Sequence, residues 1–197
     1  YFIVINQKFL LRTFQTLHGV DTVFSKAGIP IDITIVRENI EDTYGGIEHM
    51  LTNDVALSRR FITRPGSMQV IKYAFEMAKK KGCKRITCGH KANIMKLTDG
   101  LFLEVFYEIA KEYPELKADD VIVDDLCMKL VSKPDLFDVV VLTNLQGDIV
   151  SDLCAGLVDW VLRHQQILET ISLFLKRFME LLQILQGKIL PILPLYY

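Results

Sequence analysis

The sequence predicts a layered α/β fold, because strand-like and helix-like segments alternate along the chain. Residues 31–36 are alternating and β-branched, which is typical of a strand. Apolar residues at helical spacing then predict a helix that ends near Gly82; they are Val70, Ile71, Ala74, Phe75 and Ala78. Residues 85–88 predict a short strand after it. Sequential strands joined by helices favour a sheet covered by helices.

The later segments repeat this alternation. A second apolar stripe predicts a helix that ends before Pro114; it consists of Leu101, Phe102, Val105, Phe106 and Ile109. The remaining predictions are a polar loop at 37–49, a strand at 121–123 with a short helix up to Pro134, a buried strand at 137–142 and a helix at 148–158.

Composition excludes several classes of protein. The 197 residues carry a net charge of −1 with no basic tract, which argues against nucleic acid as the main partner. No apolar run approaches the ~20 residues that a membrane span needs. The start has no signal-peptide pattern and no initiator Met, so we expect a fragment of a longer protein. Half of the residues are hydrophobic, which is enough for a substantial core.

Two carboxylates in the segment 144–152 suggest a metal site. This segment, Asn-Leu-Gln-Gly-Asp-Ile-Val-Ser-Asp, predicts a strand end, a glycine turn and a helix that begins at Asp148. Asp148 and Asp152 are four residues apart and so share one helical face. Oxygen ligands of this kind suit Mg²⁺ or Mn²⁺. On spacing alone, acidic residues that complement a helix dipole are the more common explanation.

Three other segments carry candidate residues. Asp124 follows a strand, where α/β folds bind ligands, although a helix N-cap explains it equally well. Lys91 also follows a strand and suits proton transfer, although a solvated lysine is the commoner case. In the segment 37–49, Arg37 could grip a carboxylate and Tyr44 could donate a proton, unless the segment is a polar surface loop.

The order of these patterns resembles the isocitrate/isopropylmalate dehydrogenase family from about Gly28 to Val158. The patterns are R-E-N-x-E-x-x-Y-x-G-x-E-H at 37–49, H-K-x-N-I-M-K at 90–96 and N-L-x-G-D-x-x-S-D at 144–152. The first is similar to isocitrate dehydrogenases in particular. The resemblance implies that family's layered α/β fold, which is not a Rossmann fold, in incomplete form over residues 1–158, with 1–27 weakly matched.

The resemblance also implies roles for individual residues. Arg37 would bind a substrate carboxylate, Tyr44 would be the proton donor and Lys91 the proton-relay base. Asn93 would contact the substrate or the nicotinamide. Mg²⁺ or Mn²⁺ would be bound by three aspartates: Asp124, Asp148 and Asp152. In this family Lys91 and Asp124 would reach into the partner subunit's site, so we expect a homodimer with shared active sites.

The implied reaction is the metal-dependent oxidative decarboxylation of isocitrate to 2-oxoglutarate and CO₂ in the tricarboxylic acid cycle. The cofactor would be NAD, with NADP possible. The location would be the cytoplasm of a bacterium or the mitochondrial matrix of a eukaryote. The alternatives are a homoisocitrate or 3-isopropylmalate dehydrogenase, a non-catalytic regulatory subunit and a decayed gene product. Regulatory subunits usually lose the catalytic Tyr or the metal aspartates, which this chain retains.

The sequence departs from the family at both ends. The upstream S-x-N and R-x-R substrate patterns are missing from residues 1–12. After Val158 the chain reads Asp159-Trp160 where the family continues with Gly-Gly. Residues 159–162 can be written with the codons GAT TGG GTT TTG, and with a preceding G the same bases read Gly-Leu-Gly-Phe in the shifted frame. We therefore expect residues 159–197 to be an out-of-frame tail that forms no native domain.

Further decoding of the shifted frame is compatible with a loop containing H-G-T-A-P, which resembles the nucleotide loop of NAD-type enzymes. The 197-residue chain does not contain this motif in its own frame. We therefore expect this polypeptide to bind nicotinamide cofactor poorly and to be inactive by itself.

Overall fold

The structure is a computed structural model that describes residues 2–5, 8–16, 24 and 27–158. A boundary between two units of the chain falls after Val158. The prediction that residues 159–197 are an out-of-frame tail lies outside the described residues and stays a prediction.

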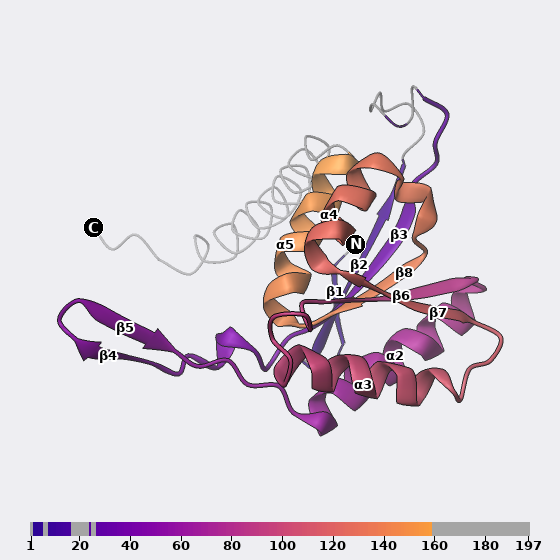
Figure 1. Cartoon of the computed structure of the whole chain (residues 1–197). Helices are drawn as coiled ribbons and strands as arrows, with labels where there is room; N and C mark the ends of the chain where they lie inside the picture. Colours follow the sequence, from indigo (N-terminus) through magenta and orange to yellow (C-terminus); the bar gives the residue numbers. More distant parts are fainter. Residues whose placement is uncertain (1, 6–7, 17–23, 25–26, 159–197) are drawn as a thin grey trace, which may run out of the picture. The chain divides into compact units, whose positions relative to one another are not determined.

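A six-stranded mixed sheet forms the centre of the first unit (Figure 1). Its order is β1-β2-β3-β8-β6-β7. The strands are β1 (Phe2–Ile5), β2 (Phe9–Gln15), β3 (Asp32–Glu38), β8 (Val139–Leu142), β6 (Arg85–His90) and β7 (Lys117–Ile122). The pairs β3–β8, β8–β6 and β6–β7 are parallel, whereas β1–β2 and β2–β3 are antiparallel. Four neighbouring strands therefore end at the same edge of the sheet.

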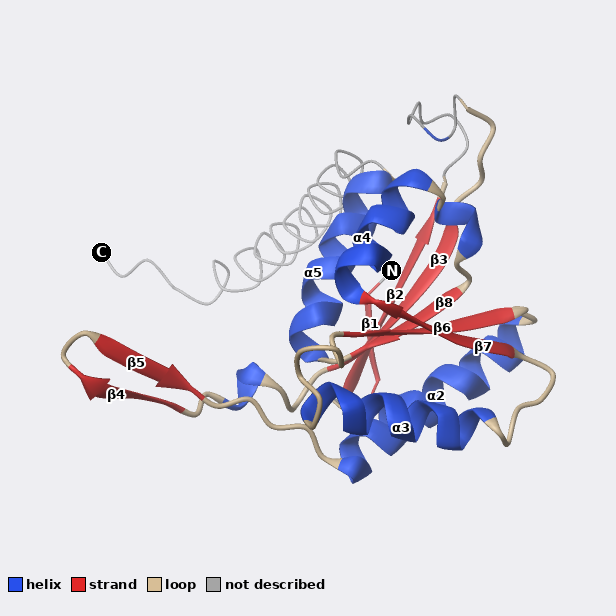
Figure 2. Ribbon diagram, in the orientation of Figure 1, coloured by secondary structure: helices blue, strands red, loops and turns tan. Residues whose placement is uncertain are grey.

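Helices cover both faces of this sheet, which confirms the predicted layered α/β class (Figure 2). α2 (Arg64–Lys81) and α3 (Thr98–Ala110) pack on one face, and α4 (Val123–Ser132) and α5 (Asn144–Leu157) pack on the other. Alternate residues of β8 enter the two cores: Val139 and Val141 face α2 and α3, while Val140 and Leu142 face α4 and α5. No described helix is both long enough and apolar enough to cross a membrane.

Helix α2 forms where the sequence predicts it, because local signals agree at both ends. The Thr63 side chain accepts a hydrogen bond from the Gly66 N–H at 3.1 Å and so caps the first turn, in which Pro65 lies. Gly82 ends the helix in the left-handed conformation with φ of 72°, which costs glycine no Cβ clash. The predicted stripe from Val70 to Ala78 is fully buried.

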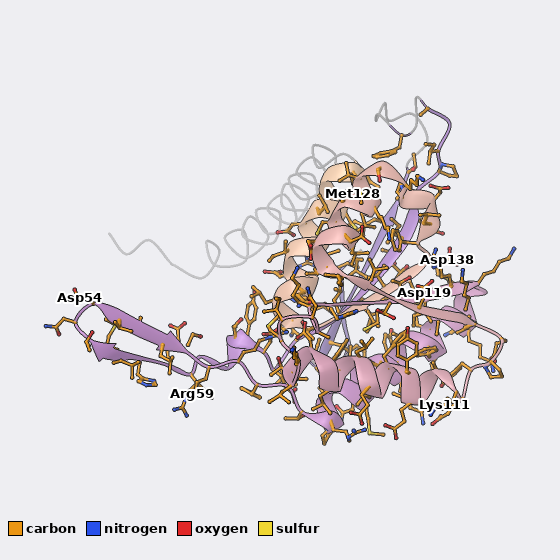
Figure 3. All side chains as sticks on the ribbon, viewed as in Figure 1. Asp54, Arg59, Lys111, Asp119, Met128 and Asp138 are labelled. Atoms are coloured by element: carbon orange, nitrogen blue, oxygen red, sulfur yellow. The ribbon has the colours of Figure 1, made fainter. Side chains whose placement is uncertain are left out.

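A hairpin replaces part of the predicted loop at 37–49. β4 (Glu48–Thr52) pairs with β5 (Val55–Ser58), and every residue of both strands is exposed. Figure 3 shows Asp54 at the tip of this hairpin and Arg59 near its base. The prediction of a loop was therefore wrong at Arg37 and Glu38, which lie in β3, and from Glu48 onward. A short 3-10 helix, η1 (Thr43–Gly45), lies between β3 and β4.

The segment 144–152 also differs from the prediction. Helix α5 begins at Asn144, four residues before the predicted start at Asp148, so Gly147 lies inside the helix and forms no turn. Thr143 is the N-cap residue directly after β8. Similarly, Val123 opens α4 rather than ending β7. A further 3-10 helix, η2 (Pro134–Leu136), connects α4 towards β8.

Candidate functional site

The candidate residues follow the carboxyl ends of the four parallel strands. Arg37 lies at the end of β3, the segment from Asn144 follows β8, Lys91 follows β6, and Asp124 comes two residues after β7. Because these ends meet at one edge of the sheet, they are where an open α/β sheet binds ligands. The order of the strands then decides which candidate residues become neighbours.

The first half-site joins β3 to the start of α5. The Asn144 Oδ1 atom accepts hydrogen bonds from Arg37 Nε at 2.9 Å and Arg37 Nη2 at 2.7 Å. Arg37 Nη1 pairs with the Asp148 carboxylate, whose other oxygen accepts a hydrogen bond from the Tyr44 hydroxyl at 2.8 Å. The guanidinium carbon of Arg37 also lies 5.1 Å from the centroid of the Tyr44 ring. Arg37, Tyr44 and Asp148 therefore form one cluster.

Arg12 of β2 brings Asp152 to the same cluster. Its Nη1 lies 3.2 Å from Asp152 Oδ1, and its Nη2 lies 3.8 Å from Asp148 Oδ1. The two aspartates face the same guanidinium because their i, i+4 spacing places them on one side of α5. The Asp152 side chain is 80% exposed, so it is open to a ligand from solvent.

The second half-site joins β6 to β7. Lys91 Nζ forms an ion pair with the Asp124 carboxylate, and its hydrogen bond to that carboxylate holds the pKa of Asp124 below the ordinary value. Both side chains are partly exposed. Asn93 lies exposed in the turn between β6 and α3. Lys91 and Asn93 follow β6, and Asp124 lies in α4 after β7, so this half-site is built on other strands than the pair β3–β8.

The described part of one chain does not assemble three metal ligands. No three His, Cys, Asp or Glu side chains in these residues lie close enough together to hold an ion. Asp148 and Asp152 supply carboxylate oxygens, which fit a hard cation such as Mg²⁺ or Mn²⁺. Asp124, the third predicted ligand, belongs to the other half-site. The carboxylates therefore have the chemistry that the metal needs, but the described residues of one chain do not bring all three together.

The phenol of Tyr44 is held in its protonated form. Its hydrogen bond to the Asp148 carboxylate, helped by desolvation, raises the pKa of Tyr44 above the ordinary value for a phenol. Tyr44 therefore carries a proton throughout the neutral pH range, as a proton donor must.

Two residues of the first half-site were missed in the sequence. Asn144 opens the 144–152 motif, but the motif alone predicted no function for it. In the structure Asn144 is 1% exposed and orients Arg37. Arg12 lies in the segment 1–12, which shows neither of the family's upstream substrate-binding patterns. Its contact with Asp152 spans 140 residues, so no local spacing could have indicated it.

Gly147 gives Arg37 room to approach α5. A Cβ atom at this position would lie 2.6 Å from Arg37 Cγ and 2.9 Å from Arg37 Cβ. We expect Gly147→Ala to displace Arg37 and to lower the free energy of unfolding by about 1–3 kcal/mol, because a packed side chain must shift. Urea denaturation measures the change.

Gly156 provides the matched control in the same helix. A Cβ atom there would meet nothing within 4 Å. Gly156→Ala should leave stability unchanged or raise it by up to ~1 kcal/mol, since Ala favours helix. Equal effects of the two substitutions would mean that the proximity of Arg37 does not constrain Gly147.

A polar cluster beside the Lys91 turn is expected to make the stability of the fold depend on pH. His90 Nε2 lies 2.9 Å from Asp120 Oδ2, and the Tyr107 hydroxyl donates to the other Asp120 oxygen. Burial alone would raise the pKa of Asp120, but these hydrogen bonds outweigh it and lower the pKa. A carboxylate with a lowered pKa stabilises the fold above its unfolded pKa, and this contribution is lost as the pH falls.

We therefore expect Asp120→Asn to lower the urea midpoint at pH 7. The difference from the unsubstituted chain should begin to shrink below about pH 4, the ordinary pKa of an unfolded aspartate, and should be lost as the pH falls through the lowered pKa of folded Asp120. Urea titrations at pH 7 and pH 3 measure both values. A difference that stays constant between the two pH values would contradict the assignment of the effect to ionised Asp120.

The described residues form a layered α/β fold with charged side chains gathered at the carboxyl ends of its parallel strands. A sequence model described as isocitrate/isopropylmalate dehydrogenase matches residues 11–159. The chain belongs to the isocitrate/isopropylmalate dehydrogenase family.

Relatives in this family carry different names at similar identity. The chain is 51% identical over 128 residues to an NAD isocitrate dehydrogenase catalytic subunit 5 of Arabidopsis thaliana, covering 65% of this chain and 34% of the relative. It is 50% identical to a chloroplastic 3-isopropylmalate dehydrogenase of Solanum tuberosum, covering 65% and 36%. The crystal structure of isocitrate dehydrogenase from Methylococcus capsulatus superposes with a TM-score of 0.74 at 47% identity, covering 78% of this chain and 45% of that one. The chain thus spans about a third of the length of these curated relatives.

Proposed function

We propose that this chain is part of an NAD-dependent isocitrate dehydrogenase that converts isocitrate to 2-oxoglutarate and CO₂ in the tricarboxylic acid cycle, with NADP as the alternative cofactor. The observation that carries this proposal is the Asp148 carboxylate, which contacts both Arg37 and Tyr44 where the parallel strands end. A cation-binding group, a carboxylate-binding group and a proton donor therefore lie around one point.

Each residue of the cluster suits one task. Arg37 and Arg12 are guanidinium groups that bind substrate carboxylates. Asp148 and Asp152 would hold Mg²⁺ or Mn²⁺, which would supply Lewis-acid polarisation of the substrate oxygens. Tyr44 donates a proton to the carbon that loses CO₂. Lys91 serves as the proton-relay base, and Asn93 contacts the substrate or the nicotinamide.

A homodimer would complete this site. Lys91 and Asp124 form a half-site of their own, so they would serve the site of a second copy. Apolar side chains are exposed on the helices that carry the aspartates: Met128 at 56% and Val131 at 48% on α4, and Ile149 at 58% on α5. Figure 3 labels Met128 on α4.

The hairpin β4–β5 supports the same proposal. An isolated two-stranded hairpin is marginally stable in water, yet both of its strands are wholly exposed, including the apolar residues Met50, Leu51 and Val55. Pairing with a second copy would bury them. The sedimentation coefficient or light scattering of the purified chain measures its oligomeric state.

A 3-isopropylmalate or homoisocitrate dehydrogenase is the second candidate. The 50% identity to a 3-isopropylmalate dehydrogenase favours it, whereas the R-E-N-x-E-x-x-Y pattern at 37–44 favours isocitrate. A protein whose gene is restored to the other reading frame after codon 158 should be assayed with all three acids. A kcat/KM highest for isocitrate would support our choice, and a preference for either other acid would replace it.

We propose that the 197-residue chain itself is inactive because its frame does not encode the nucleotide loop. Isothermal titration should detect Mn²⁺ binding and isocitrate binding in the presence of Mn²⁺, but no NAD binding in the micromolar range. If the chain binds neither Mn²⁺ nor isocitrate, the proposed site is overturned. Micromolar NAD binding would overturn the proposed loss of the nucleotide loop.

A further inference from the structure

Arg60 lies between two fully buried aspartates that belong to different parts of the site. Its Nε and Nη2 atoms pair with the Asp42 carboxylate, with Nη2 at 3.1 Å from Asp42 Oδ2. Its Nη1 atom pairs with Asp99. Both aspartates are 0% exposed, and the Arg60 side chain is 14% exposed. We call Asp42, Arg60 and Asp99 the arginine clamp.

The Asp42 arm of the clamp holds the Tyr44 segment against α5. Asp42 Oδ1 accepts from the Thr43 N–H at 2.8 Å, and Oδ2 accepts from the Leu145 N–H at 3.0 Å in the first turn of α5. Asp42 has a φ of 76°, a backbone conformation that residues other than glycine rarely adopt. These contacts offset that strain and set the direction in which the chain enters the 3-10 helix containing Tyr44.

The Asp99 arm holds the Lys91 turn. Asp99 Oδ2 accepts from the Lys91 backbone N–H at 2.6 Å and from Gln146 Nε2 at 2.8 Å. Asp99 lies in the first turn of α3, directly after the turn that contains Lys91 and Asn93. The clamp thereby reaches the second half-site and ties it to Gln146 of α5.

Only a guanidinium can serve this geometry. Arg60 donates from three nitrogens in one plane to two carboxylates, and its Nη2 also donates to Thr143, the N-cap of α5, at 2.9 Å. A lysine has one ammonium nitrogen and cannot span the two carboxylates in this way. Removal of the cation would leave two buried carboxylates without their positive partner, which favours separation of the two segments.

We propose that Arg60 is a positioning residue that fixes Tyr44 of the first half-site and Lys91 of the second in one arrangement relative to α5. This role rests on the proposed function of Tyr44 and Lys91. The coupling between the two segments is a property of the clamp alone and can be measured without any ligand.

Hydrogen–deuterium exchange of the full chain tests the coupling. In Arg60→Met we expect exchange in the segments 42–47 and 90–96 to accelerate together by about tenfold or more, while β3 and β8 keep their rates. In Arg60→Lys, which retains the charge and so protects against unfolding, at least one of the two segments should still accelerate. The proposal is overturned if neither segment responds to either substitution, or if all segments accelerate equally.

Arg64 is the matched control. It also bridges two carboxylates, those of Glu104 and Glu108, but on the exposed surface between α2 and α3. Arg64→Met should leave exchange in both site segments unchanged. Acceleration there as large as in Arg60→Met would overturn the special role of the buried clamp.

Ligand binding separates this proposal from the proposed function. Mn²⁺ alone should bind to Arg60→Met within about threefold of the unsubstituted chain, whereas isocitrate in the presence of Mn²⁺ should bind about tenfold more weakly. Equal isocitrate affinity in both proteins would overturn the positioning role and leave the function standing. Coupled acceleration without isocitrate binding by any variant would support the clamp and reject the function.

Discussion

Asp148→Asn should weaken Mn²⁺ binding by about a hundredfold or more and abolish measurable isocitrate binding. The carboxylate of Asp148 pairs with Arg37, accepts the Tyr44 hydrogen bond and lies near Arg12. An amide has the same shape but only one acceptor oxygen and no charge, so it is a poor ligand for a hard cation. A hundredfold loss corresponds to about 2.7 kcal/mol. Isothermal titration with Mn²⁺, before and after addition of isocitrate, measures both effects.

The same substitution has an effect that needs no metal. Because the hydrogen bond to Asp148 and the negative charge of its carboxylate raise the pKa of Tyr44, their loss should lower that pKa. The phenolate absorbance of the variant, corrected with Tyr44→Phe, should therefore appear at lower pH. Titration of Tyr44 at an unchanged pH would show that Asp148 does not control the phenol.

Asp125 provides the control for both measurements. It lies in the first turn of α4 and pairs with Lys129 at 2.6 Å, one turn further along the same helix. Asp125→Asn removes a carboxylate of the same charge and similar exposure from outside both half-sites. Its Mn²⁺ affinity should stay within about twofold of the unsubstituted chain. A loss as large as that in Asp148→Asn would mean that net charge, and not the site, sets the affinity.

The elements with strong internal periodicity were predictable from the sequence. The stripe of α2 and that of α3 recur at helical spacing, and the structure buries Val70 to Ala78 and Phe102 to Ile109 at those positions. The strand predicted at 31–36 appears as β3, two residues longer at its end. These helices are recognisable in the sequence because packing against the sheet requires an apolar residue on the buried face at every helical turn.

Elements whose shape depends on distant partners were not predictable. Gly147 suggested a turn, yet it lies in α5, and a glycine fits this position because the Arg37 side chain passes where a Cβ would be. The hairpin β4–β5 has no buried face, so no alternation marks it. The arginine clamp joins positions 42, 60 and 99, and nothing in local spacing connects them.

The grouping of the site residues follows from the sheet and not from the motifs. The sequence motifs named Arg37, Tyr44, Lys91 and the three aspartates, but their spacing leaves their neighbours undetermined. The order β3-β8-β6-β7 pairs Arg37 with α5 and Lys91 with Asp124. The three aspartates therefore divide between two groups, and the proposed metal site requires a second copy of the chain.

The largest expected effect on stability comes from Phe75, whose ring lies in the core beneath α2. Phe75 is 0% exposed, and its ring centroid lies 5.3 Å from that of Phe106 and 5.1 Å from that of Tyr113. Phe75→Ala should lower the free energy of unfolding by about 3–5 kcal/mol, through lost burial and the cavity that remains. This is a large share of the ~5–15 kcal/mol that stabilises a typical protein. Urea denaturation followed by circular dichroism measures it.

Met68 is the matched control because it lies on the same helix and is 43% exposed. Met68→Ala should change the free energy of unfolding by less than about 0.5 kcal/mol, as surface substitutions do.

Because α2 and α3 pack together and α3 carries Asp99, loosening of Phe75 should also weaken the clamp. Faster hydrogen exchange in segment 90–96 of Phe75→Ala would show this link. If Phe75→Ala lowers the free energy of unfolding no more than Met68→Ala does, the α2–α3 layer does not contribute the packing energy that its burial implies.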